Sequence, residues 1–273
     1  MGELQTKQQR LEEQLGKLTS LIVAYSGGVD SAYLAHAAHH VLGRRMLAVT
    51  ALSASYSARD RAEAEKCVSR FHFPHEFVET NELANPSYRA NQADRCYFCK
   101  DELFEKLGTL AKQRGFAAVA YGINADDVGD WRPGQQAARE HRILTPLLDA
   151  GLTKADIREL ARRVDLPVWD RPASACLSSR IAYGIEVTPA RLAVVEKGEE
   201  ALRALGFRQF RVRYHGELVR IEISQEELPR ALDPAMSRKF VEIFKALGFK
   251  FVTLDLEGFR SGSMNSLLVN INK

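Results

Sequence analysis

The chain has 273 residues, of which 45% are hydrophobic and 27% charged, so it is long enough for one large or two modest globular domains. Its net charge of +3 argues neither for nor against a nucleic-acid partner, because a basic binding surface would have to be local. No segment has the apolar length of a membrane span or the pattern of a secretory leader, so we expect a cytoplasmic protein with no membrane partner. In that compartment, four cysteines favour core, metal-binding or catalytic roles over structural disulfides.

The first 172 residues alternate short apolar runs with amphipathic segments. The periodicity predicts helices over 3–18, 31–42, 58–71, 100–114 and 153–164, and strands over 20–25, 46–52, 76–79 and 117–120. The polar stretch 82–98 is expected to be irregular. Strands that alternate with helices predict an α/β fold with a doubly wound parallel sheet, whose ligands bind at the carboxyl ends of the strands.

The pattern of predicted helices and strands changes after Pro172. A loop-like stretch over 173–187 precedes predicted helices over 188–205 and 234–247 and predicted strands over 207–214, 217–223 and 250–256. The first two of these strands flank His215-Gly216, which predicts a hairpin. This order indicates a smaller α+β domain, so we expect two domains, 1–172 and 173–273.

The segment from Ser26 to Ser31 reads SGGVDS and lies between the first predicted strand and the next helix. Such a turn directs backbone N–H groups at a phosphate; Gly27 and Gly28 allow close approach, and the two serines add hydroxyls. Asp30 is the best candidate to bind Mg²⁺. The alternative is an ordinary Ser-Gly turn, which the flanking strand and helix disfavour. The segment resembles the PP-loop of ATP pyrophosphatases, which implies that it holds the pyrophosphate end of ATP while a substrate attacks the α-phosphate.

A second polar loop opens at Gly122, a further candidate for the nucleotide site, and contains Asp126, Asp127 and Asp130. Any of the three aspartates could support the metal. The alternative is that they belong to a polar turn that caps the next helix.

Three of the four cysteines are candidates for metal binding or catalysis. Cys96 and Cys99 form a CxxC motif, and Cys176 lies in SACLSSR. Three thiolates leave a tetrahedral zinc site incomplete, whereas on a [4Fe–4S] cluster they would leave one iron open. The alternative is that they are buried residues or a structural zinc site. Cys67 shares a helix face with apolar residues, so we expect it in the core.

Several arginines indicate anion binding. Arg211 and Arg213 share one face of a predicted strand and could grip a phosphate, unless they form a solvated face balanced by Glu222. Arg260 lies in a glycine-containing loop after the last strand. Lys100 and Arg180 are candidates to stabilise the α-phosphate, although both could be surface residues.

Five segments together resemble the LarE family, ATP-dependent sulfur transferases that mature the nickel-pincer cofactor of lactate racemase. The segments are AYSGGVDS, GDWRPG, SSRIAYG, FRVRYH and LDLEGFRSGSMN, and they extend nearly from end to end. The resemblance implies a PP-loop domain followed by a sulfur-transfer domain. It also implies that ATP adenylates a carboxylate of a pyridinium dicarboxylate mononucleotide, after which sulfur replaces AMP to give a thiocarboxylate.

The family divides by its sulfur donor. In one branch a single cysteine before SSR gives up its own sulfur; in the other, three cysteines bind a [4Fe–4S] cluster that carries the sulfide. Cys96, Cys99 and Cys176 match the second branch, with donation from Cys176 itself as the alternative. The resemblance further implies that Arg211 and Arg213 bind the substrate phosphate and that the transfer site is lined by Glu199, Glu222, Ser179 or Arg180, and Arg260.

The partners expected are a small nucleotide substrate, a second copy of the chain in a homo-oligomer, and transient contacts with other cofactor-maturation proteins. Three other functions compete with this interpretation. A tRNA-thiolating enzyme should show a broad basic surface and an RNA-binding module, which the near-neutral charge and the lack of such a module in the sequence disfavour, so we do not expect a nucleic-acid partner. An ammonia-using ligase would not need three cysteines. A zinc-bound scaffold with a degenerate loop would not form AMP.

Overall fold

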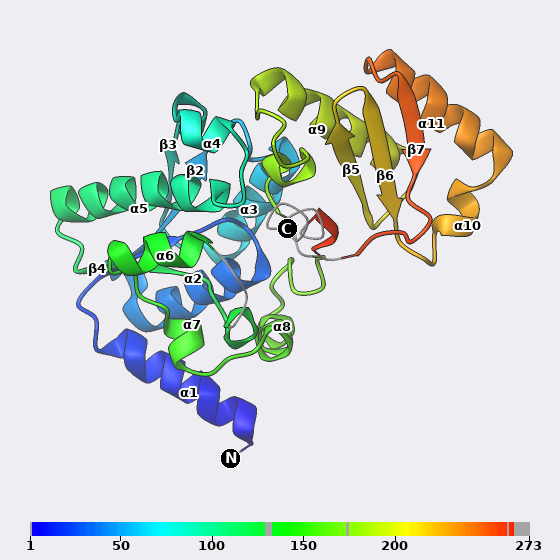
Figure 1. The fold of residues 1–273 in the computed structure, drawn as a ribbon. Coiled ribbons are helices and arrows are strands. Elements are labelled where there is room, and N and C mark those ends of the chain that lie inside the picture. The colour runs from blue at the N-terminus through cyan, green and yellow to red at the C-terminus, as the bar shows by residue number, and fades with distance from the viewer. Residues whose placement is uncertain (1, 129–132, 173–174, 261, 265–273) are drawn as a thin grey trace. The chain divides into compact units, whose positions relative to one another are not determined.

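The computed structural model describes residues 2–128, 133–172, 175–260 and 262–264 (Figure 1). The chain divides into two compact units. The first comprises 1–82 and 96–174, and the second comprises 83–95 and 175–273. Residues 83–95, from the first half of the sequence, therefore belong to the C-terminal unit. The change in sequence pattern after Pro172 does not indicate this.

The first unit is built on a four-stranded parallel sheet. Its strands are β1 (Leu21–Ala24), β2 (Met46–Leu52), β3 (His75–Glu79) and β4 (Ala118–Tyr121), in the order β3-β2-β1-β4. This confirms the predicted α/β fold. The strand order reverses at β1, because β2 and β3 lie on one side of it and β4 lies on the other. A crevice is therefore expected at the carboxyl ends of β1 and β4.

Helices cover both faces of this sheet, as Figure 1 shows. The helices are α1 (Glu3–Gly16), α2 (Val29–Leu42), α3 (Ala58–Phe71), α5 (Arg95–Arg114), α6 (Pro133–Glu140), α7 (Pro146–Asp149) and α8 (Lys154–Arg163). Side chains of β1 alternate between the faces: Leu21 and Val23 enter a core with α1, α2 and α8, whereas Ile22 and Ala24 enter a core with α5 and α6. Cys67 is fully buried in the first core, as predicted.

The expectation of an irregular stretch over 82–98 is wrong in part. The short helix α4 (Pro86–Arg89) lies there, and α5 begins at Arg95 rather than at Lys100. The cause is tertiary: the buried Arg95 side chain donates to the Ser178 carbonyl (2.9 Å), and the Asn91 amide donates to the Ala182 carbonyl (2.9 Å). Local patterns do not reveal such bonds. The short helices α6 and α7 were not predicted either.

The second unit contains a three-stranded sheet of β5 (Phe210–His215), β6 (Leu218–Ile223) and β7 (Phe251–Leu254). β5 and β6 pair antiparallel, as the hairpin prediction requires, and β7 pairs parallel to β6. Alternate side chains, including Val212 and Ile221, pack with α9 (Pro189–Ala204) and α11 (Pro234–Ala246) in one core. The opposite face therefore carries the charged residues of β5 and β6. The short helix α10 (Leu228–Ala231) follows β6.

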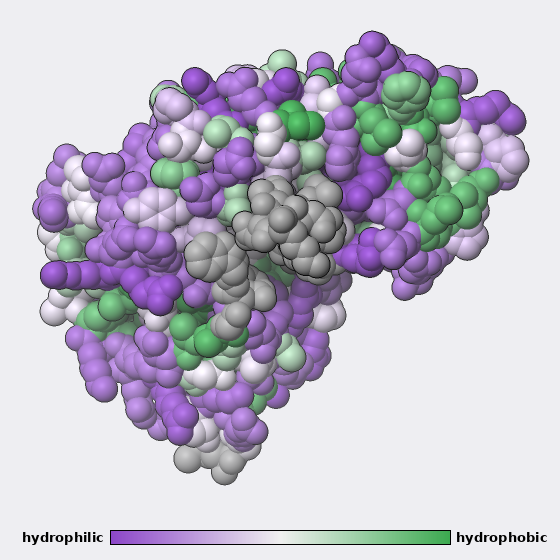
Figure 2. Space-filling view, viewed as in Figure 1, coloured by the Kyte–Doolittle hydropathy of each residue, from purple (hydrophilic) through white to green (hydrophobic). Residues whose placement is uncertain are grey.

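Figure 2 shows apolar side chains gathered on the surface of the second unit, where Val241, Phe251 and Leu256 are exposed. The expected homo-oligomer stays a prediction. Within the described ranges, no helix is both long enough and apolar enough to span a bilayer.

Gly122 determines how closely β4 approaches α2. A Cβ atom at this position would lie 2.7 Å from the Ser31 backbone nitrogen and 2.9 Å from the Asp30 carbonyl carbon. Both are backbone atoms, so neither can turn aside as a flexible side chain would. The end of β4 can therefore rest on the first turn of α2 only if residue 122 has no side chain.

We predict that Gly122→Ala lowers the free energy of unfolding by about 1–3 kcal/mol, because the added methyl group forces the two backbones apart. The matched control is Gly108→Ala in α5, where an added Cβ would meet no atom within 4 Å. That variant should be unchanged or more stable by up to about 1 kcal/mol, since alanine favours a helix over glycine. Urea unfolding of both variants measures the difference, and equal stabilities would contradict the assigned contact.

Candidate functional site

The SGGVDS loop connects β1 to α2 and is held by its own serines. The Ser26 N–H donates to Ser31 Oγ (3.1 Å), and the Ser31 hydroxyl donates to the Gly28 carbonyl (3.0 Å). Gly27 has a φ of +75°, and a Cβ there would lie 2.9 Å from the Ala64 Cβ, so this position requires glycine. Gly28 is the N-cap of α2 and provides no side-chain cap, so the first turn keeps N–H groups for a ligand. The predicted strand, turn and helix are confirmed.

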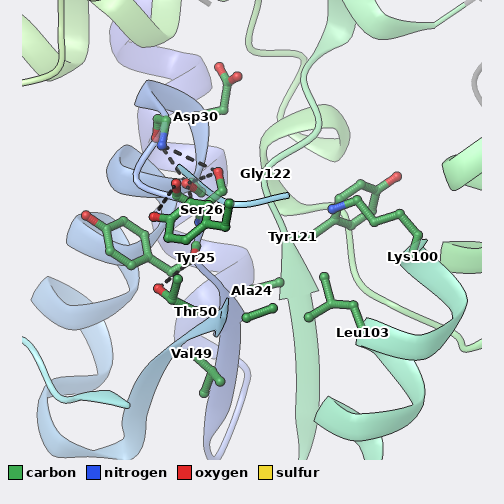
Figure 3. A pocket seen from close by; sticks show the side chains of 14 residues that line it. Ala24, Tyr25, Ser26, Asp30, Val49, Thr50, Lys100, Leu103, Tyr121 and Gly122 are labelled. Carbon is green, nitrogen blue, oxygen red and sulfur yellow. Dashed lines mark hydrogen bonds between the residues drawn. The ribbon is translucent and has the colours of Figure 1, made fainter. Parts of the chain in front are cut away.

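A cavity of about 150 Å³ lies beside this loop at the carboxyl ends of β1, β2 and β4. Figure 3 shows Lys100 reaching into it from α5, where its ammonium lies 5.7 Å from the centre of the Tyr121 ring. The Tyr56 hydroxyl donates to the Ser26 carbonyl (3.1 Å), and burial raises the pKa of this phenol, which keeps it protonated. The lining is Ala24, Tyr25, Ser26, Gly28, Asp30, Ser31, Val49, Thr50, Ala51, Tyr56, Lys100, Leu103, Tyr121 and Gly122.

Asp30 lies in the first turn of α2 with its two carboxylate oxygens in different situations. Oδ2 accepts a hydrogen bond from the ammonium of Lys154, the first residue of α8. Oδ1 is buried and has no hydrogen-bond partner within the described structure. A buried carboxylate oxygen without a partner, beside a helix N-terminus that favours phosphate, fits a Mg²⁺ ion that arrives with a nucleotide. Sequence reasoning missed Lys154 because its only local signal is its place in a capped helix.

The acidic loop after β4 has a local structural role. Asp127 Oδ2 accepts the Asn124 N–H (3.2 Å), and Asn124 Oδ1 accepts the Asp126 N–H (3.0 Å), which closes a short turn. Asp126 Oδ2 accepts the backbone N–H of Lys154 (2.7 Å) at the start of α8. The capping alternative thus describes both aspartates, and Asp126 fixes the residue that pairs with Asp30. Asp130 and the rest of 129–132 lie outside the described residues.

Cys96 is exposed and Cys99 is partly exposed, and they lie one helical turn apart at the start of α5 in the first unit. Cys176 is partly exposed in the second unit and forms the N-cap of a short turn over Leu177–Arg180. All three carry thiol side chains, the donor chemistry that iron–sulfur clusters use. Among the described residues, no three His, Cys, Asp or Glu side chains gather around one point that could hold an ion.

Arg180 and Glu199 form a buried bidentate ion pair in the second unit. Arg180 Nε donates to Glu199 Oε1 (2.8 Å) and Nη2 donates to Oε2 (3.2 Å). The remaining nitrogen, Nη1, donates to the Cys176 carbonyl (3.0 Å) and to Ser179 Oγ (3.1 Å). The surface interpretation of Arg180 is therefore wrong: its guanidinium fixes the backbone that carries Cys176.

A second buried network surrounds Arg213. Its Nη2 donates to Glu222 Oε2 (2.8 Å) and Ser263 Oγ (2.9 Å), and its Nη1 donates to the Ser179 carbonyl (3.1 Å). Glu222 is fully buried and also accepts from Arg220 (3.0 Å). The alternative of a solvated charged face is therefore wrong. Arg213 Nε is buried and has no hydrogen-bond partner in the described structure, so one donor of this arginine remains for a ligand.

The charges of this cluster favour an anion. Burial, with help from neighbouring Arg180 and Arg213, lowers the pKa of Arg211 to about 10. Its guanidinium lies 5.0 Å from the centre of the Phe259 ring. Four arginines (180, 211, 213 and 220) face three carboxylates in these contacts, those of Glu199, Glu222 and Asp255. Arg260, by contrast, is exposed and pairs with Glu257 (2.5 Å).

The parallel sheet and the SGGxDS loop at the end of β1 define a protein of the PP-loop class. A scan against family models finds no match. The chain is 42% identical to an uncharacterized protein of Synechocystis sp., over 97% of this chain and 99% of the relative. It is 34% identical to the pyridinium-3,5-bisthiocarboxylic acid mononucleotide synthase of Lactiplantibacillus plantarum, over 98% and 97%. It is also 26% identical to a tRNA-specific 2-thiouridylase of Rickettsia felis, over only 58% and 53%.

The chain therefore belongs to the LarE family of sulfur transferases within the PP-loop superfamily, and it is an enzyme.

We predict that Glu199→Gln destabilises the second unit by about 3–5 kcal/mol, because it leaves the buried Arg180 guanidinium without its carboxylate. The matched control is Glu200→Gln, the exposed neighbour on α9, which should stay within about 0.5 kcal/mol of the wild type. Urea unfolding followed by circular dichroism compares the two. If both variants lose the same stability, the buried pair does not have the role assigned to it.

Proposed function

We propose that this enzyme uses ATP to activate a carboxylate of a pyridinium dicarboxylate mononucleotide and then exchanges AMP for sulfur, giving a thiocarboxylate. The observation that carries this proposal is the full-length relationship to a bisthiocarboxylic acid mononucleotide synthase, together with the PP-loop at the end of β1. The product would serve the nickel-pincer cofactor of lactate racemase or of another nickel enzyme.

In the first step, a substrate carboxylate oxygen attacks the α-phosphorus of ATP and the bond to the bridging oxygen breaks. Pyrophosphate leaves with the bonding electrons, and the carboxylate becomes an acyl adenylate. The residues proposed to hold the pyrophosphate are Ser26, Gly27, Gly28 and Ser31, with Asp30 on Mg²⁺. Lys100, which lines the same cavity, would stabilise the negative charge that develops on the α-phosphate.

The second step replaces AMP at the acyl carbon by sulfur. A [4Fe–4S] cluster held by Cys96, Cys99 and Cys176 would supply the sulfide. Arg180 would keep Cys176 in place through the backbone bond described above. Arg211 and Arg213 would bind the phosphate of the substrate, for which the four arginines that face three carboxylates and the Nε donor of Arg213 provide support. Glu199, Glu222 and Ser179 would line this site, with Arg260 at its exposed margin.

An alternative donor within the same reaction is Cys176 itself, since its thiol is free and partly exposed. Thiolation of tRNA has weaker support, because the similarity to the tRNA-specific 2-thiouridylase covers little more than half of either chain.

We predict that Asp30→Asn keeps the fold but abolishes pyrophosphate release, because a neutral amide is a poor ligand for Mg²⁺. The matched control is Asp170→Asn, an exposed aspartate of the same unit, which should leave release unchanged. Pyrophosphate formed from ATP in the presence of substrate is the quantity measured. Normal release by Asp30→Asn would remove the metal role from this carboxylate.

We predict that the anaerobically purified enzyme contains about four irons per chain, as expected for one [4Fe–4S] cluster. Cys96→Ala, Cys99→Ala and Cys176→Ala should each lose the iron, because three ligands hold the cluster. Cys67→Ala is the matched control and should retain it, since Cys67 is buried in the core. Iron, sulfide and zinc analysis provides the test, and zinc in place of iron would contradict the proposed donor.

A further inference from the structure

The pairing of Lys154 with Asp30 has a consequence for how the metal enters the site. This inference rests on the proposed use of a divalent cation with ATP. The carboxylate that would hold the cation already has a cation of its own, the Lys154 ammonium on Oδ2. The two side chains are largely buried, with 32% and 19% of their surfaces exposed, so solvent screens the pair only in part.

Lys154 is held at a fixed point while its ammonium remains able to move. Its backbone N–H donates to Asp126 Oδ2 (2.7 Å), and the preceding Thr153 caps α8 by accepting the Asp156 N–H (3.1 Å). Asp156 also accepts from Lys7 of α1 (2.9 Å), which ties the start of α8 to a third element. The four-carbon stem of Lys154 thus extends from a helix end that hydrogen bonds hold in place, and rotation about the bonds of the stem is enough to move the ammonium away from Asp30.

We propose that Lys154 is the resident counter-ion of Asp30 and makes cation binding depend on the nucleotide. In the free enzyme the pair is neutral, so a bare divalent ion gains little by displacing the ammonium. ATP adds the negative charge of its phosphates at the helix N-terminus, which attracts the ion and offers Lys154 a second anionic partner. Metal and nucleotide therefore bind with positive coupling, and Lys154 is a positioning residue for the metal site.

Mn²⁺ is the probe for this coupling, because it accepts the same oxygen ligands and its free form is measured directly by electron paramagnetic resonance. Without nucleotide, Lys154→Met should bind Mn²⁺ about tenfold more tightly than the wild type, the change expected when one partly screened charge is removed beside the ion. Lys154→Arg should restore the weak binding. With a non-hydrolysable ATP analogue present, the difference between Lys154→Met and the wild type should shrink.

Two controls separate the proposal from a structural effect. Lys7→Met removes a different lysine that contacts α8 and should not change Mn²⁺ binding. The double variant Asp30→Asn, Lys154→Met should lose the gain, because the gain requires the Asp30 carboxylate. The proposal is overturned if Lys154→Met binds Mn²⁺ no more tightly than the wild type, or if the gain survives in the double variant. Pyrophosphate release by the wild-type enzyme tests the proposed function separately, so failure of one does not imply failure of the other.

Discussion

The contact between Gly122 and the first turn of α2 is the constraint on which the candidate nucleotide site depends. Two backbones meet there without a side chain between them, so the end of β4 lies directly against the residues that start the helix. This contact forms one wall of the cavity beside the PP-loop and fixes the position of the loop that follows β4. That loop in turn fixes Lys154 through Asp126. A single glycine thus links the sheet, the phosphate loop and the ion pair.

Charged side chains in both units position the groups to which the proposed function assigns the chemistry. In the first unit, Lys154 holds the Asp30 carboxylate. In the second, Arg180 is oriented by Glu199 and holds the Cys176 carbonyl. The Arg180–Glu199 pair is buried, and a buried pair contributes little net stability but is costly to break, so it holds a defined geometry strongly. Two arginines that sequence analysis regarded as possible surface residues, Arg180 and Arg213, are buried in such pairs.

Sequence analysis predicted correctly those features of the fold that depend on residues close together in the chain. The parallel sheet, the PP-loop, the hairpin around His215-Gly216 and the burial of Cys67 follow from patterns a few residues long, and the structure confirms them. The predicted start of α5 was wrong because the observed start depends on hydrogen bonds from Arg95 and Asn91 to residues more than 80 positions away. Lys154 was missed for the same reason, since it reaches Asp30 across 124 positions. Asp126 and Asp127, which follow β4, accept hydrogen bonds from backbone N–H groups. The sequence alone does not show whether such aspartates bind backbone groups or a metal ion.

The central claim is that sulfur transfer is catalytic and not the sacrifice of a cysteine. The most direct measurement is the number of thiocarboxylate groups formed per chain, under anaerobic conditions with ATP, substrate and added sulfide, with the mass of the protein determined afterwards. Our account predicts many products per chain and a protein that retains the Cys176 sulfur. A reaction that stops after one product, with one sulfur lost from Cys176, would contradict it.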